Sequence, residues 1–367
     1  LANFWTDPRQ CPEWKRGWAT CLFYRYPTRK ELEKALGKLA TPHTEGGLTI
    51  EMPGDLTSNP PASRLASIFV AEMEKKTYER MRDFLRKELR CEALLTNMNN
   101  AAARVPAAQL ARASFDYVDE HFYVDHPQFL ERPWRLPSSS PNANPIPAGA
   151  PGGINVAAAR VFGKPFTITE YNYAGPGRFR GVGGILTGAL GAIQDWDAMW
   201  RFAYSHNHRN LFEAAPIGYF DLVSDPLNQA ADRLTLFLFL RGDLAPAKNR
   251  LAVVLPETEI LNPQQPLDLT TLYPAGWAAQ IGTVVLPKGA ETPTGITPLP
   301  ANPELAKTAL AEAMKQIGAE SAQKQVTIDT KNATLSIDSP KSAGGYAEKG
   351  ETISTSSVEV RDLTHGA

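Results

Sequence analysis

The chain has 367 residues, enough for roughly two to three domains at about 150 residues each. Its 38 Lys and Arg residues and 39 Asp and Glu residues give a formal charge of −1, which argues against nucleic acid as a partner. Hydrophobic residues make up 43% and charged residues 21%, which is typical of globular rather than disordered proteins. No apolar run reaches the roughly 18 residues of a membrane span.

The three cysteines, Cys11, Cys21 and Cys91, are too few and too scattered for a disulfide framework or a zinc site, although Cys11 and Cys21 could pair. The sequence begins at Leu1 without the charged and apolar regions of a signal peptide, and both of its ends look cut. We therefore leave the localisation and the oligomeric state open.

Residues 1–62 are predicted to form a connector that holds one short helix, Thr28–Leu39. Thr28 followed by Glu31 matches a capping box at the start of that helix. The next element is predicted as a long amphipathic helix over Pro61–Leu89, because its apolar residues recur at helical spacing with charges between them.

Four predicted strands then alternate with three predicted helices. The strands are Cys91–Met98, Phe115–Tyr123, Pro165–Tyr171 and Ala198–Tyr204, and the helices are Ala101–Ala113, Ile154–Phe162 and Gly183–Ile193. Such alternation favours parallel pairing through right-handed crossovers. The predicted fold class is therefore α/β, and the four strands amount to half of a (β/α)8 barrel.

Residues 216–367 are predicted to be β-rich and sandwich-like. Leu251–Leu255 and Val284–Leu286 have the composition of strands, and a helix is expected over Pro303–Gly318. Three alternating runs predict a truncated antiparallel β-module, namely Val326–Asp329, Ala333–Ile337 and Thr352–Val360.

Polar residues follow the carboxyl ends of all four predicted barrel strands, where the chemistry of such barrels takes place. They include Asn97, Asn99, Asp119, His121, Tyr123, Glu170, Asn172, Tyr204 and His206. Strand alternation puts Asp119, His121 and Tyr123 on one face, and Phe166, Ile168 and Glu170 on one face. Glu170 is then either a functional carboxylate or the partner of a structural salt bridge to Arg178 or Arg180.

Other residue groups leave alternatives open. Trp196 either stacks on a sugar at the barrel mouth or packs in the core. Asp116, Asp119, His121, Asp125 and His126 suggest a metal-dependent hydrolase, but their spacing matches no ordinary ligand set. The glycine-rich stretch Gly175–Gly191 lacks the Lys-Ser/Thr ending of a phosphate loop, so we interpret its glycines as turn and helix-packing residues.

Three motifs carry a family resemblance: Phe115–Pro127 (FDYVDEHFYVDHP), Lys164–Asn172 (KPFTITEYN), and Gln194–Asp197 (QDWD) followed by Phe202–His206 (FAYSH). Together they resemble strands six, seven and eight of clan-A retaining glycoside hydrolases, and more narrowly the cellulase-like glycosyl hydrolases of bacterial genomes. The resemblance covers most of the chain and is most specific at Lys164–Asn172.

This resemblance implies that residues 1–215 form the C-terminal half of the barrel, with strands five to eight within residues 88–210. It also implies retaining hydrolysis of O-glycosidic bonds, preferably β-linked, in oligo- or polysaccharides. It implies Glu170 as the nucleophile, with Tyr123 and His121 orienting it or the sugar. The implied substrate contacts are Asn97, Asn99, Asn172, Trp196, His206 and Arg178. A carbohydrate is the expected partner, no cofactor or metal is expected, and secretion would suit such an enzyme.

The chain departs from the family in one respect. Retaining enzymes need a second carboxyl about 5 Å from the nucleophile, and the family carries it as a Glu at the end of strand four. This sequence shows no strand four, so the acid/base Glu is expected to be absent and the chain alone inactive. The alternatives are a non-catalytic carbohydrate-binding protein, an inactive remnant and the metal-dependent hydrolase.

Overall fold

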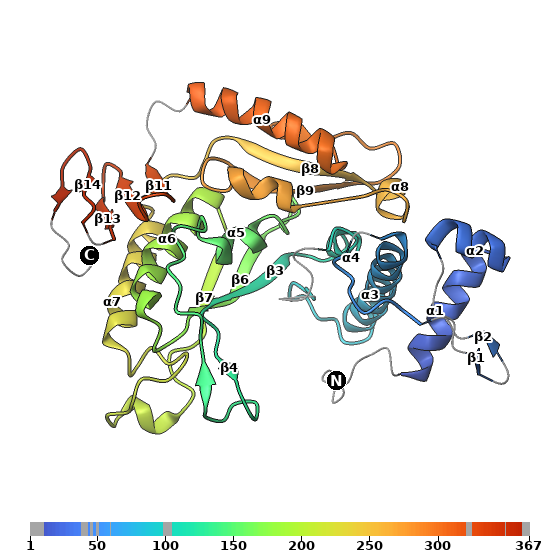
Figure 1. Ribbon diagram of the computed structural model, residues 1–367, viewed down its shortest axis with the longest axis horizontal. Helices are drawn as coiled ribbons and strands as arrows, with labels where there is room; N and C mark the ends of the chain where they lie inside the picture. Colours follow the sequence, from blue (N-terminus) through green and yellow to red (C-terminus); the bar gives the residue numbers. More distant parts are fainter. Residues whose placement is uncertain are drawn as a thin grey trace.

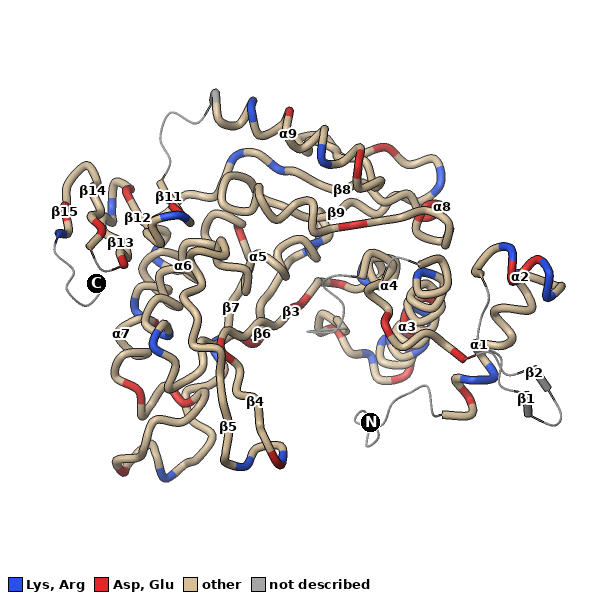
Figure 2. The backbone as a smooth tube through the Cα atoms, in the orientation of Figure 1, with Lys and Arg blue, Asp and Glu red and all other residues tan. Residues whose placement is uncertain are grey.

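The computed structural model describes residues 11–37, 43–44, 47–48, 51–58, 60–97, 105–320, 325–348 and 350–361. The fold is mixed α/β, with two three-stranded parallel sheets and small antiparallel sheets toward the C-terminal end (Figure 1). Among the described residues no closed barrel forms. Acidic and basic residues are interspersed along several of the helices, in keeping with the near-zero net charge (Figure 2).

The first parallel sheet contains three of the four strands predicted for the half barrel. Its strands are β3 (Val118–Val124), β6 (Phe166–Tyr173) and β7 (Ala198–Arg201), in the order β3-β6-β7. All neighbouring pairs are parallel, as the alternation of strands and helices predicted. Glu170 lies within β6, the central strand of this sheet.

The strand predicted at Cys91–Met98 is wrong over its described residues, 91–97, which form no strand. The segment nevertheless lies beside the residues that lead into β3, because the Asp116 N–H donates to Leu95 O at 3.0 Å. The Asp116 carboxylate accepts the Leu95 N–H at 2.8 Å and pairs with Arg86 at 2.7 Å. The Asp116 side chain therefore accepts a hydrogen bond from a backbone N–H that would bond to a backbone carbonyl in a regular β-ladder.

Helices α5 (Pro151–Ala157) and α6 (Gly183–Gln194) cover the apolar face of this sheet. Close packing in this layer depends on glycine. A Cβ on Gly184 would lie 1.7 Å from Ala231 O of α7 (Pro226–Thr235), and one on Gly183 would lie 2.4 Å from the Tyr173 ring. The interpretation of these glycines as helix-packing residues is confirmed.

The N-terminal helices pack around a separate small core. They are α1 (Pro12–Arg25), α2 (Arg29–Leu36) and the start of α3 (Pro61–Lys87), and their buried residues include Trp18, Leu22, Leu65 and Phe69. The capping box of Thr28 and Glu31 is confirmed. The short hairpin of β1 (His43–Thr44) and β2 (Gly47–Leu48) lies between α2 and α3 in the sequence. Helix α4 is shorter than predicted, Ala108–Arg112, and residues 101–104 lie outside the described residues.

The second parallel sheet comes from the region predicted to be β-rich. It contains β8 (Arg250–Pro256), β9 (Gln280–Leu286) and β10 (Thr297–Leu299) in the order β10-β8-β9. The predicted strands Leu251–Leu255 and Val284–Leu286 and the helix α9 (Pro303–Glu320) are confirmed. This region also holds helices α7 and α8 (Glu257–Ile260) and a π-helical turn, Leu236–Leu240, so it is more helical than predicted.

Antiparallel strands end the described chain. β11 (Val326–Asp329), β12 (Thr334–Asp338) and β13 (Ala343–Tyr346) form one sheet, and β14 (Ile353–Ser354) pairs with β15 (Glu359–Val360). The first two predicted runs are confirmed, and the third is divided between β14 and β15. The domain boundary near residue 215 stays a prediction. Within the described residues, none of the helices is both long and apolar enough to span a membrane.

Candidate active site

A bulge in β6 decides which way Glu170 points. Glu120 pairs with Ile168 and His121 pairs with Glu170, so Thr169 is an extra residue without a counterpart on β3. An inserted residue reverses the alternation of side chains beyond it. The prediction that Glu170 shares a face with Phe166 and Ile168 is therefore wrong, because the bulge turns Glu170 to the side of His121.

Two side chains of the neighbouring strand lie against the Glu170 carboxylate. Tyr123 Oη donates a hydrogen bond to Glu170 Oε2 at 2.5 Å, and His121 Nδ1 lies 3.4 Å from the same oxygen. The Glu170 side chain is 34% exposed, so a ligand has access to it. The three residues expected to carry the chemistry are thus brought together at the carboxyl-terminal part of β3 and β6.

A buried hydrogen-bond network holds the His121 imidazole on its Nε2 side. Asp119, 2% exposed, accepts hydrogen bonds from Thr167 Oγ1 at 2.7 Å and from Thr169 Oγ1 at 2.5 Å. Because the Thr169 hydroxyl donates to Asp119, it accepts from His121 Nε2, which lies 2.9 Å away. The imidazole is thereby oriented with Nδ1 toward Glu170. No role was predicted for these two threonines, although Thr169 directly precedes Glu170 and Thr167 lies three residues before it.

Burial and the neighbouring carboxylate raise the pKa of the Tyr123 phenol above its ordinary value. Since the folded-state pKa is raised, the contribution of Tyr123 to stability is complete below pH about 10, the pKa of an unperturbed tyrosine, and is lost as the pH rises above it.

We expect a spectrophotometric titration of the phenols to show this directly. Subtracting the Tyr123→Phe titration from that of the native chain should leave no ionisation near pH 10, because Tyr123 ionises only at higher pH. As a control, Tyr204→Phe removes a tyrosine whose side chain is 61% exposed. An ordinary ionisation step near pH 10 in the Tyr123 difference would contradict the hydrogen bond to Glu170.

Asn172 was predicted to contact substrate, and the structure gives it another role. Its side chain is fully buried, at 0% exposure. Its amide donates to Phe202 O and, at 2.9 Å, to Phe220 O, and its carbonyl accepts from Arg201 at 2.9 Å. With all of this amide engaged, Asn172 positions the backbone of two aromatic residues instead.

The proposed stacking role of Trp196 is also wrong. Trp196 precedes β7, at the amino end of the strand and away from the Glu170 end of the sheet. It is 4% exposed within the main core, and its ring lies 5.8 Å from that of Phe166. Core packing, the other interpretation left open by the sequence, is the one observed.

Neither predicted arginine pairs with Glu170. Arg178 pairs with Glu348 at 3.2 Å, and Arg180 pairs with Asp225 at 2.6 Å. In the described part of the chain, Glu170 has no ion pair with a lysine or arginine. The salt-bridge alternative for Glu170 is therefore wrong, whereas contact of the exposed Arg178 with substrate stays a prediction.

The other residues predicted to contact substrate are His206, Asn97 and Asn99. His206 Nδ1 lies 2.5 Å from Asp221 Oδ1, and the His206 ring lies 4.9 Å from Phe202, whose ring in turn packs edge-on against Tyr123. Asn97 donates a hydrogen bond to Glu74 of α3. Asn99 lies outside the described residues.

The metal alternative finds no support among the described residues, which contain no group of three metal-binding side chains. Asp116 is engaged by Arg86, and Asp119 by the two threonines. His126 Nδ1 lies 3.0 Å from Pro127 O. The Asp and His residues that are dense in the sequence are thus dispersed into separate hydrogen bonds.

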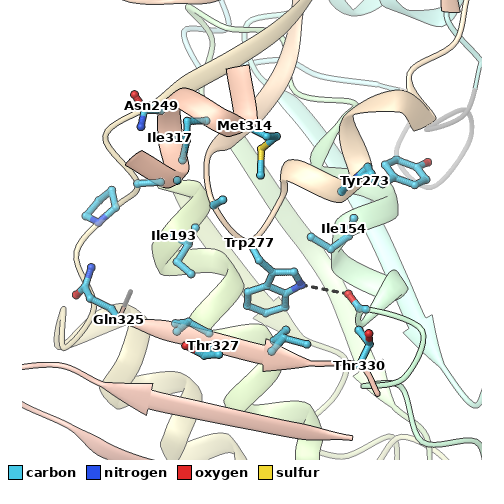
Figure 3. A pocket seen from close by; sticks show the side chains of 18 of the residues that line it. Ile154, Ile193, Asn249, Tyr273, Trp277, Met314, Ile317, Gln325, Thr327 and Thr330 are labelled. Carbon is cyan, nitrogen blue, oxygen red and sulfur yellow. Dashed lines mark hydrogen bonds between the residues drawn. The ribbon is translucent and has the colours of Figure 1, made fainter. Parts of the chain in front are cut away.

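A large cavity of about 1220 Å³ lies elsewhere, among the loops near Trp277, the end of α9 and the first strand of the antiparallel sheet (Figure 3). Its lining combines Ala, Pro and Ile residues with Asn, Gln, Thr, Tyr and Trp side chains, and its charged lining residues are Lys248 and Asp338. It contains none of the residues around Glu170. We therefore place the candidate active site by its chemistry rather than by this cavity.

Comparison of the chain with models of known protein families and with curated proteins finds no match. The functional assignment therefore depends on the residues and their geometry.

Proposed function

We propose that this chain carries the nucleophile side of a retaining glycoside hydrolase site. Glu170 is the nucleophile, and Tyr123 and His121 orient its carboxylate. The observation that supports this most is the convergence of the Tyr123 phenol and the His121 imidazole on one oxygen of a partly exposed glutamate. One carboxylate oxygen is thus fixed by hydrogen bonding, and the other remains to attack an anomeric carbon.

In this proposal β3, β6 and β7 correspond to strands six, seven and eight of a (β/α)8 barrel. Their parallel order agrees with that assignment, as does the position of Glu170 toward the carboxyl end of β6. Residues 216–367 then follow the barrel and end in a sandwich-like module. The proposal assigns no acid/base carboxylate to the described residues, so a test should use a substrate that does not require it.

The test is covalent trapping with activated fluorosugars. These are β-glycosides with fluorine beside the anomeric carbon and dinitrophenolate as the leaving group, which departs without a proton. A Glu170 oxygen bonds to the anomeric carbon as the bond to dinitrophenolate breaks, and fluorine slows hydrolysis of the ester. We expect one sugar per chain, located on Glu170 by peptide mass spectrometry, from at least one of the gluco, xylo, manno and galacto reagents.

Glu348 provides a matched control. It accepts a hydrogen bond from Tyr346 Oη at 2.8 Å, and its side chain is 30% exposed, so it resembles Glu170 in both respects. Glu348→Gln should leave the labelling unchanged, whereas Glu170→Gln should abolish it. Equal labelling of both glutamates would mean non-selective reaction. No labelling, together with measurable glycan binding, would favour the carbohydrate-binding alternative.

A further inference from the structure

A continuous group of aromatic rings leads from the candidate active site to the surface. The Tyr123 ring packs edge-on against His126 at 5.6 Å and against Phe220 at 5.3 Å. Both of these rings contact Trp134, with centroid distances of 5.9 Å from His126 and 6.2 Å from Phe220. Trp134 is itself 60% exposed. A large aromatic ring is thus presented to solvent two ring contacts away from the phenol that holds Glu170.

Trp134 is held in place although it is exposed. It lies in the loop between β4 (Gln128–Phe129) and β5 (Ser138–Ser139), which pair as an antiparallel hairpin. Its ring packs against Phe129 at 4.9 Å, and Ser138 Oγ forms a 2.6 Å hydrogen bond with Tyr219 Oη. Such bracing fixes the indole before any ligand arrives, which lowers the entropy that binding would cost.

We propose that Trp134 is a sugar-stacking platform for the unit next to the one held at Glu170, an inference that rests on the function proposed above. One face of a pyranose ring carries C–H groups, and these fit the electron-rich face of an indole. The Tyr123 ring contacts His126 and the His126 ring contacts Trp134, so the exposed indole lies two ring contacts from the phenol that holds Glu170. The platform therefore selects for chains of at least two sugars.

The test measures how affinity depends on chain length. All variants carry Glu170→Gln, so that no substrate is turned over. The probes are cello-, xylo- and β-manno-oligosaccharides of one to four units, and the dissociation constants are measured by titration calorimetry. Removing a tryptophan from the centre of a binding site commonly weakens binding by about tenfold or more. We expect about a tenfold loss for Trp134→Ala with two or more units, and no change with the monosaccharide.

Two further variants separate stacking from hairpin structure. Trp134→Phe keeps an aromatic face and should restore part of the affinity for longer chains. Trp200→Ala removes a tryptophan of similar exposure, 53%, that makes none of the ring contacts in this group, and it should bind like its parent. A structural role of Trp134 alone would lower the melting temperature without making the loss of affinity depend on chain length.

The outcomes of the two tests are distinct. Fluorosugar labelling of Glu170 by a monosaccharide reagent needs only the first sugar position. If labelling succeeds but Trp134→Ala binds long and short chains as its parent does, the platform is refuted and the nucleophile stands. If labelling fails but Trp134→Ala loses affinity for the longer chains alone, the platform is supported as part of a non-catalytic glycan-binding site. If no probe binds to any variant and Glu170 is not labelled, both proposals are refuted.

Discussion

The Glu170→Gly variant is expected to lose the burst of dinitrophenolate that the native chain should release from activated β-glycosides. Loss of a nucleophile commonly lowers the reaction rate by several orders of magnitude. We expect dinitrophenolate release to slow by at least about a thousandfold in this variant. Added azide should restore steady release, because the small anion enters the space of the missing carboxylate. Its nitrogen bonds to the anomeric carbon as dinitrophenolate leaves, in a single displacement that inverts the configuration.

The configuration of the product makes this result specific. An α-glycosyl azide, identified by its NMR coupling constant, would place Glu170 on the side opposite the leaving group, as a nucleophile must be. A β-glycosyl azide would instead make Glu170 an acid/base residue and contradict the proposal. Glu348→Gly is the control, and we expect it to keep the native burst.

The alternation of strands and helices could be predicted from the sequence, because it depends on the spacing of residues that are close together in the chain. Period-two and helical spacings of apolar residues gave the strands containing His121 and Glu170 and the helices that cover them. A strand was wrongly predicted at residues 91–97, where the Asp116 side chain accepts the Leu95 backbone N–H. Such a contact depends on which segments meet in space, and the local pattern does not contain it.

The identity of Glu170 as a candidate followed from the sequence, but its orientation did not. Period-two alternation has no place for the extra residue Thr169, which is recognisable only from the pairing of β3 with β6. The same limit applies to two tryptophans. Trp196 follows a buried helix and lies in the core, whereas Trp134, which we propose as a stacking platform, lies on a hairpin that hydrogen bonds to Tyr219, far along the chain.

Arg112→Met is expected to destabilise the fold by about 3–5 kcal/mol, because it leaves Glu120 charged and unpaired in the core. Arg112 on α4 hydrogen bonds to Glu120 on β3, and each side chain is 1% exposed. Burial raises the pKa of Glu120, and the Arg112 charge opposes that shift. Without Arg112 the pKa of Glu120 should rise further. The loss of folding stability should therefore be largest near pH 7 and become smaller at lower pH, where Glu120 is protonated.

Urea denaturation of matched variants at pH 7 and pH 5 separates charge from packing. Arg209 and Glu213 form an ion pair at 2.8 Å with 74% and 59% exposed side chains, so Arg209→Met should change stability by less than about 1 kcal/mol. The double variant Arg112→Met with Glu120→Leu removes both charges and should regain most of the lost stability, because an apolar pair needs no compensation. If the double variant were as unstable as Arg112→Met alone, lost packing rather than the uncompensated carboxylate would be the cause. A pH-independent loss of stability would lead to the same conclusion, and the contact of α4 with β3 would then depend on packing rather than on charge.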